Sequence, residues 1–321
     1  MANVNDSDFN ALGVQNCFSL TVELKSEGVL GGPRSKKISY ALDSNKIKIE
    51  IEQYCIRTLK FTAASPIQME RMWDFYSKIE RLLMLFDGRF YYIESICFTG
   101  NATSQEEYDA YANECSSRRL SYYKTDPIYC YTHHCFLNFN AVLSPELISK
   151  WIMLQDELDI VHQVALYNIA DTGITHDVKC ANFIECLEPI AEIIGVYDTS
   201  FSAQKYGKRK ITLRMYIDAV ISKYGKDIFP DEYSINKDAF LQILVNTRHR
   251  IMHIKRKQPD AKYLSGAQSI LYLIKLCHLY RVVLLSLLGI DYSEYQSKVN
   301  QSIKEWNDWN GVLSDFISKL K

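Results

Sequence analysis

The stretch FLQILVNTRHRIMH, residues 240–253, decides the fold of the second half of the chain. Apolar residues recur in it every three or four positions, which predicts an amphipathic helix over residues 236–256. On a wheel of about 100° per residue, the side expected to face the core carries Phe240, Ile243, Leu244, Thr247, Ile251 and Ile254. His249 and His253 fall roughly opposite that side. A second apolar strip, formed by Leu241, Val245 and Met252, indicates another burial partner, for which a second subunit is the simplest candidate.

The sequence around this stretch is helical in character from Ser144-Pro145 onward, where Ser144 suits a helix cap and Pro145 a first helical position. Further helices are expected near residues 145–170, 178–194, 211–224, 264–288 and 293–318. The segment 264–288 is apolar nearly all round, which is typical of a helix in the middle of a bundle.

The first part of the chain is strand-rich. Residues 45–52, NKIKIEIE, alternate apolar and charged side chains, the period of a sheet with one wet face. Strands are expected within residues 16–62, at 90–98 and at 128–139, and Ser65-Pro66 predicts the start of a helix that ends at Gly88. The predicted fold is therefore α+β: a strand-rich domain at 1–143, followed by an all-α bundle at 144–321.

Composition limits the function. The chain has 321 residues, a net charge of -1 and 47% hydrophobic residues, so nucleic-acid binding would need a local basic patch. The N-terminus has no apolar signal sequence, and the run from Leu276 to Leu288 is short for a bilayer span and contains His278 and Arg281. Together with nine cysteines, an odd number, these features predict a cytoplasmic protein with reduced thiols and no membrane contact.

Arg248 and His253 are the residues expected to carry chemistry. A histidine can move a proton to or from an RNA oxygen near neutral pH, and an arginine can neutralise charge that develops on a phosphate. Because RNA supplies its own 2′-hydroxyl nucleophile, we expect no metal and no cofactor. Acid–base work at two oxygens needs more than one such pair, which again favours a homodimer.

The segment Arg248 to His253 resembles the signature of HEPN domains: Arg, a polar residue, three variable residues, His. Its apolar approach at 240–247 and the apolar helix ending Leu287-Leu288-Gly289 look most like the ApeA-type HEPN group, over roughly residues 150–290. The resemblance implies a dimeric, metal-independent endoribonuclease of a bacterial toxin or anti-phage system. A strand-rich N-terminal domain would then sense a phage-derived trigger or bind an inhibitory partner. His249 stands where this group commonly has Asn, which leaves its catalytic role open.

RNA phosphates are expected to meet the remaining cations around the motif. These are Arg250, Lys255, Arg256 and Lys257, with a second cluster at Lys208, Arg209 and Lys210. Two alternatives remain for the motif. One is a catalytically inactive HEPN-type module that binds RNA or protein. The other is a solvated basic helix end that suits the helix dipole.

Three other features of the sequence each have a functional and a structural interpretation. Cys130, His133, His134 and Cys135 suggest zinc, but a strand would divide them between two faces, so a metal site is the minor alternative. Glu185, Glu188 and Glu192 share one side of a helix, as a solvated face or as carboxylates orienting a catalytic histidine. The tyrosine pairs at 91–92 and 122–123 are interpreted as strand formers rather than stacking platforms for bases.

Overall fold

A computed structural model describes residues 16–25, 33–54, 56–89, 91–100, 104–120, 135–169, 174–198, 200–201, 211–253 and 261–320. The described residues form two compact units, one within 1–130 and 138–152 and the other within 131–137 and 153–321. The first contains a five-stranded antiparallel sheet and the second is helical, which confirms the predicted α+β class.

The sheet of the first unit has the strand order β2-β3-β4-β1-β5, with every neighbouring pair antiparallel. Its strands are β1 (Asn16–Lys25), β2 (Arg34–Leu42), β3 (Asn45–Gln53), β4 (Arg57–Gln68) and β5 (Tyr92–Thr99). The predicted alternation holds in β3, where Ile47, Ile49 and Ile51 are fully buried. Glu50 lies between Ile49 and Ile51 and points to the opposite face of the sheet, where its carboxylate forms ion pairs with Lys37 and Lys48.

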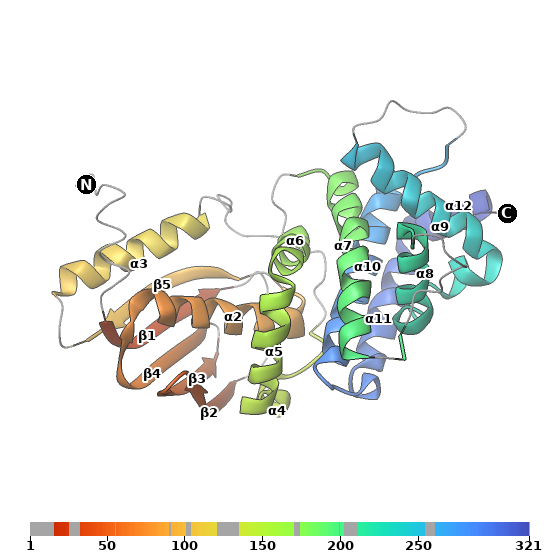
Figure 1. Ribbon diagram of the computed structural model, residues 1–321. Coiled ribbons are helices and arrows are strands. Elements are labelled where there is room, and N and C mark those ends of the chain that lie inside the picture. Colours follow the sequence, from red (N-terminus) through yellow and green to blue (C-terminus); the bar gives the residue numbers. More distant parts are fainter. Residues whose placement is uncertain are drawn as a thin grey trace. The chain divides into compact units, whose positions relative to one another are not determined.

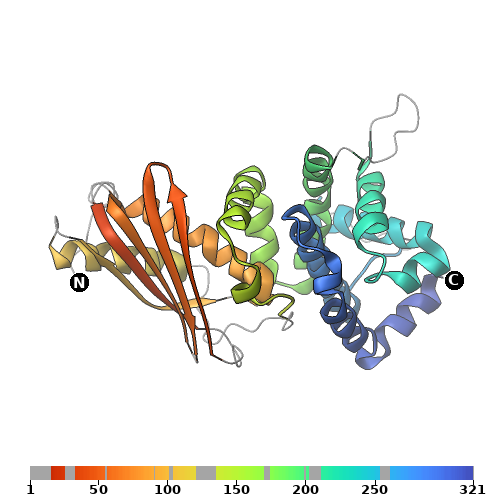
Figure 2. The same cartoon turned by 90° about the horizontal axis from the view of Figure 1, so that it is seen from below.

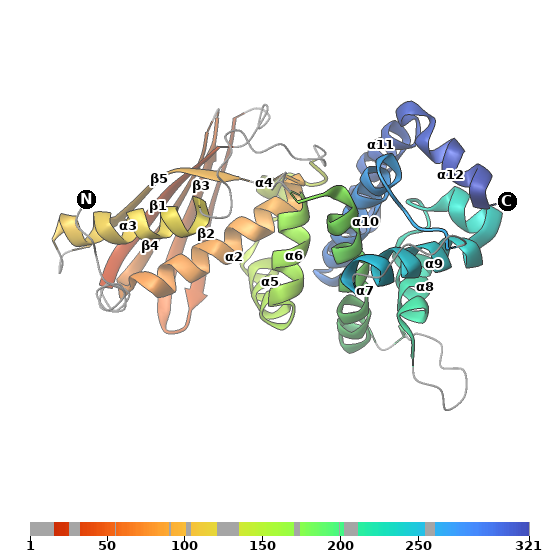
Figure 3. The ribbon, with the colours of Figure 1, turned by 90° about the horizontal axis from the view of Figure 1, so that it is seen from above.

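Two helices cover the buried face of this sheet (Figures 1–3). Helix α2 (Met69–Asp87) packs on β1 and β4, and α3 (Gln105–Leu120) packs on β5. The predicted helix start at Ser65-Pro66 is wrong, because both residues belong to β4. The pairing of β4 with β1 jumps from Thr62 to Ile67 there, and Pro is tolerated in such an irregular segment. The predicted end is correct: Gly88 terminates α2 with φ 62.

The residues from 128 to 139 do not form the predicted strand where the structure describes them. Residues 135–138 are outside any strand, and Phe139 begins the short helix α4 (Phe139–Val142), while 121–134 lie outside the described residues. Asn138 is the N-cap of this helix, because its side chain accepts a hydrogen bond from the Asn140 amide.

The helical region consists of α5 (Pro145–Glu157), α6 (Asp159–Ile169), α7 (His176–Tyr197), α8 (Leu213–Tyr224), α9 (Pro230–Met252), α10 (Ala267–Leu287), α11 (Gln296–Asn307) and α12 (Val312–Leu320), with short 3-10 turns η1 (Tyr292–Glu294) and η2 (Trp309–Gly311). Two predicted helices are divided. The segment 145–170 breaks at Leu158. The segment 293–318 breaks at η2, where Asn310 and Gly311 both have positive φ.

Helix α10 is the buried centre of the helical unit, as predicted. It packs against α7, α8, α11 and α12. By length and composition alone it could cross a membrane, but 83% of its most apolar stretch is buried within the protein. Two of its buried polar residues have partners inside the unit: His278 contacts the Ile274 carbonyl at 2.9 Å and Ser302 Oγ at 2.8 Å, and Lys275 donates to Glu232 at 2.6 Å.

Helix α9 carries the motif and lies between α7, α8 and α12 (Figure 3). It begins at Pro230, earlier than predicted, and is interrupted at Asn236, whose φ is -160°. The Asn236 side chain then accepts a bond from the Ala239 amide and starts the second segment, near the predicted helix start. That segment ends at Met252 rather than at residue 256, with His253 as its C-cap.

Candidate active site

The end of α9 brings Arg248 and His253 together. Arg248 Nη1 lies 2.8 Å from His253 Nε2. A guanidinium only donates hydrogen bonds, so Nε2 is the acceptor, which assigns the ring proton to Nδ1. His253 is the C-cap of the helix, with φ -102° and ψ 7°. The arrangement joins a proton acceptor and a fixed positive charge.

Glu185, on α7, binds the other side of the same guanidinium. Arg248 Nε donates to Glu185 Oε2, and Arg248 Nη2 donates to Glu185 Oε1 at 2.8 Å. This is a bidentate ion pair, the strongest geometry in which a carboxylate binds an arginine. The pair lies at the protein surface, with side-chain exposures of 17% for Arg248 and 39% for Glu185.

The electrostatics follow from this pair. The hydrogen bond from Arg248 lowers the pKa of Glu185 below its usual value of 4.5, and the charges of Arg248, His253 and His249 act in the same direction. Conversely, the hydrogen bond to Glu185 raises the pKa of Arg248, with smaller contributions from the charges of Glu185 and Glu188. Glu185 and Arg248 are therefore both ionised at neutral pH.

His249 and Arg250, the next two residues of the motif, also have defined neighbours. The His249 ring stands beside the His253 ring, with centroids 5.6 Å apart. The Arg250 guanidinium lies over the ring of Tyr263, 4.0 Å from its centroid. Such cation–π stacking covers one face of a guanidinium and leaves its edges for hydrogen bonding. Both residues are half-buried on the helix that carries Arg248.

Thr247 forms hydrogen bonds that connect α9 to the segment at residues 261–264, which follows the motif. Its hydroxyl donates to the Ile243 carbonyl at 2.8 Å and accepts from the Leu264 amide at 2.9 Å. Both Thr247 and Leu264 are 1% exposed. The predicted core position of Thr247 is therefore correct, and its hydroxyl holds residues 261–264 to α9 together with Asn246, which donates to the Lys262 carbonyl at 3.0 Å.

The wheel misjudged the second apolar strip of α9. Leu241 and Val245 are 2% and 9% exposed within this chain alone, so they require no second subunit. Met252, in contrast, is 41% exposed. Ile251, assigned to the core, is only half-buried, and Ile254 lies outside the described residues.

Several predicted residues also lie outside the described part of the chain. They are Lys208, Arg209, Lys210, Lys255, Arg256, Lys257, Cys130, His133 and His134. Among the residues that are described, no group of three or more His, Cys, Asp or Glu side chains could hold a metal ion.

The three glutamates on α7 differ in what they contact. Glu185 binds Arg248, and Glu192 accepts a bond from the Tyr216 hydroxyl at 3.3 Å. Glu188 acts on Arg248 through its charge. The spacing of these acids was visible in the sequence, but the arginine partner, 63 residues away, could only be found from the pairing of α7 with α9.

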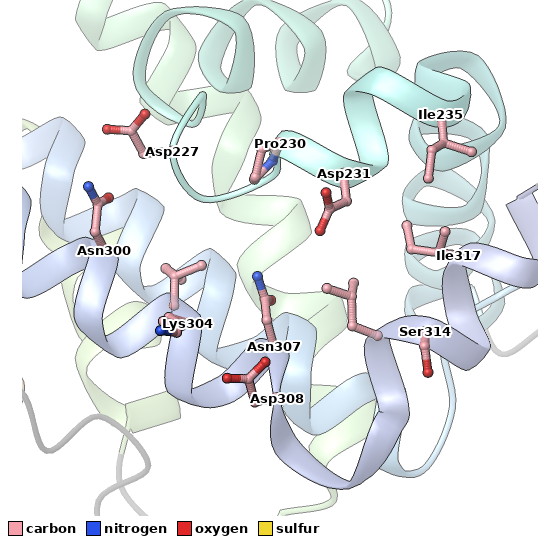
Figure 4. Close-up of a pocket in the computed structure, with 12 residues that line it drawn as sticks. Asp227, Pro230, Asp231, Ile235, Asn300, Lys304, Asn307, Asp308, Ser314 and Ile317 are labelled. Carbon is pink, nitrogen blue, oxygen red and sulfur yellow. The ribbon is translucent and has the colours of Figure 1, made fainter.

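A cavity of about 590 Å³ lies at the opposite end of α9, between its first turn and helices α11 and α12 (Figure 4). Figure 4 shows Asp231 and Asn307 pointing toward this space. The lining also includes Asp227, Lys304 and Asp308, over an apolar floor with Ile303 and Leu313. None of the predicted catalytic residues lines it.

Comparison with known proteins bears on the helical unit. The sequence model of the Apea-like HEPN family matches residues 189–294, which include Arg248, His249 and His253. No similar curated protein and no similar solved structure was found. The match covers α8, α9 and α10 completely, together with the second half of α7. The C-terminal part of this chain, at residues 189–294, is therefore an Apea-like HEPN domain.

Proposed function

We propose that Arg248 and His253 form the active site of a metal-independent endoribonuclease. The observation that carries the proposal is the 2.8 Å contact between Arg248 Nη1 and His253 Nε2. The family supports it, because HEPN domains are commonly ribonucleases and typically bind RNA. One side chain that stays positive and one that exchanges protons near neutral pH suit phosphodiester cleavage.

In the proposed reaction the RNA 2′-oxygen attacks the adjacent phosphorus. A bond forms between that oxygen and phosphorus, the bond from phosphorus to the 5′-oxygen breaks, and a 2′,3′-cyclic phosphate remains. His253 accepts the proton of the 2′-hydroxyl at Nε2 once the Arg248 Nη1–H has turned from that nitrogen to the substrate, and Arg248 stabilises the negative charge on the phosphate oxygens in the transition state.

The leaving 5′-oxygen needs a proton from a second group. In a homodimer, His253 of a second copy would supply it, and HEPN domains often dimerise. Met252 supports a contact at this place, because it is 41% exposed and directly precedes His253. Within one chain, the nearby His249 is the alternative proton carrier.

Uncontrolled RNA cleavage would harm the host cell, which bears on the biological role that we propose. A cytoplasmic endoribonuclease of a bacterial anti-phage or toxin system requires control, and the N-terminal unit is the candidate for sensing a phage-derived trigger or binding an inhibitor. RNA would be held by Arg250 and by the basic clusters at 208–210 and 255–257.

The test is incubation of the purified protein with RNA in excess EDTA. The proposal expects cleavage that survives chelation and is lost in both Arg248→Ala and His253→Ala, while Lys298→Ala, a change on α11, leaves it unaltered. RNA binding without cleavage in the wild-type protein would instead identify a catalytically inactive RNA-binding module. Cleavage that is unchanged in His253→Ala would overturn the assignment.

A further inference from the structure

Glu185 leaves Arg248 in a defined orientation. The carboxylate takes the edge of the guanidinium formed by Nε and Nη2, using both of its oxygens. Arg248 has five N–H groups, and the three contacts to Glu185 and His253 use three of them. Within the described part of the chain, one N–H on Nη1 and one on Nη2 remain for a substrate, and neither belongs to the edge that Glu185 occupies.

An arginine without such a partner samples many rotamers, and a phosphate would have to select one of them. Glu185 makes this selection before RNA binds. The carboxylate comes from α7, a separate helix packed along α9, so the orientation is set by the fold rather than by local sequence. Pro189 lies four residues after Glu185 and has no N–H for the Glu185 carbonyl, which interrupts the helical hydrogen bonds at this turn.

The carboxylate has an electrostatic cost at such a site, because it repels a polyanion. An acid that served only RNA binding would therefore be out of place beside Arg248, His249 and His253. An acid that fixes the direction of the guanidinium raises the reaction rate at the expense of affinity. We propose that Glu185 is a positioning residue that aims the free edge of Arg248 at the scissile phosphate. This inference rests on the proposed ribonuclease function.

Single-turnover cleavage tests the inference, with the rate constant and the RNA dissociation constant measured separately. We expect Glu185→Ala to slow the chemical step by up to about 100-fold, the scale of a misplaced catalytic group, and to leave RNA binding unchanged or tighter. Glu185→Gln keeps the shape of the side chain but loses its charge, so its chemical rate should lie between those of the wild type and Glu185→Ala. Glu185→Ala in an Arg248→Ala background should have no further effect, because its only target is gone.

Glu188→Ala is the matched control. Glu188 lies one turn further along α7 and carries the same charge, but within the described part of the chain it forms no hydrogen bond to Arg248. It should change RNA affinity as much as Glu185→Ala does and leave the chemical step unaltered. A purely structural role of Glu185 would lower thermal stability and affinity together and would not produce this difference.

Three results would overturn the inference: Glu185→Ala with the rate of Glu188→Ala, a faster rate than wild type, or additive losses with Arg248→Ala. These differ from failure of the proposed function, in which the wild-type protein cleaves RNA independently of Arg248 or does not cleave it. In that case the NMR signal of the Arg248 Nε–H decides. Positioning requires a protected signal in the wild-type protein that disappears in Glu185→Ala but persists in Glu188→Ala.

Discussion

Arg248 and His253 are five residues apart in the sequence, and their side chains meet at 2.8 Å. In a continuous α-helix, residues at this spacing point about 140° apart. Here His253 is the C-cap of α9, with φ -102° and ψ 7°, and its amide still donates to the His249 carbonyl at 3.3 Å. The two side chains therefore meet at the last turn of the helix.

Replacement of Arg248 by lysine should not preserve activity. Lysine keeps the positive charge, but it cannot form a bidentate contact with Glu185 and contact His253 at the same time. We expect a loss of about 100- to 1000-fold in cleavage rate, the scale seen when one preorganised donor is removed. Arg250→Lys, whose side chain stacks on Tyr263 instead, should lose far less. Equal losses in the two variants, measured under single-turnover conditions, would contradict this assignment.

His249 and His253 should differ in their tolerance of asparagine. His253→Asn removes the proton acceptor, which should slow cleavage by about 100- to 10000-fold. His249→Asn keeps a polar side chain beside His253 and is expected to remain close to wild type in rate. If His249→Asn were as impaired as His253→Asn, then both histidines of one chain would be needed for proton transfer.

The pKa of Glu185 offers a test that does not need RNA. Because Arg248 lowers this pKa in the folded protein, the pair contributes stability that is complete above the unfolded value near 4.5 and is lost as the pH falls through the lower, folded value. An NMR titration of the Glu185 carboxyl carbon should give a midpoint below 4.5, and Arg248→Ala should raise it. A midpoint that Arg248→Ala does not move would exclude the pairing in solution.

Thr247 should be required for stability rather than for chemistry. Thr247→Val keeps the shape but leaves the buried Leu264 amide without its acceptor, which should cost about 1–3 kcal/mol of unfolding free energy. Denaturant titration measures this loss. Thr247→Ser retains the hydroxyl and serves as the control: its Leu264 amide should stay protected from hydrogen exchange, whereas that amide should exchange rapidly in Thr247→Val.

The sequence predicted features that arise from local periodicity. The alternating isoleucines of β3 indicate which face of the strand is buried, and the apolar residues all round α10 indicate a central helix; the structure agrees with both. Chain breaks were predicted less well. Asn310 and Gly311 form a dipeptide suited to positive φ, so the break at this point has a signal in the local sequence. Leu158 carries no such signal, and the break there was not predictable from local sequence.

The candidate site shows the same division. The motif itself was visible, and its core residue Thr247 was correctly placed. What the wheel could not supply was the meeting of Arg248 with Glu185, because it requires two helices far apart in the chain to pack together.

The central claim is that the Arg248–His253 site cleaves RNA through the substrate's own 2′-hydroxyl. Its most direct test is mass spectrometry of the products from a cleaved oligonucleotide and from the same oligonucleotide with 2′-O-methyl groups, both in EDTA. The account predicts 5′ fragments that end in a 2′,3′-cyclic phosphate and no cleavage of the methylated substrate. Cleavage of the methylated substrate, or fragments that end in a free 3′-hydroxyl, would contradict it.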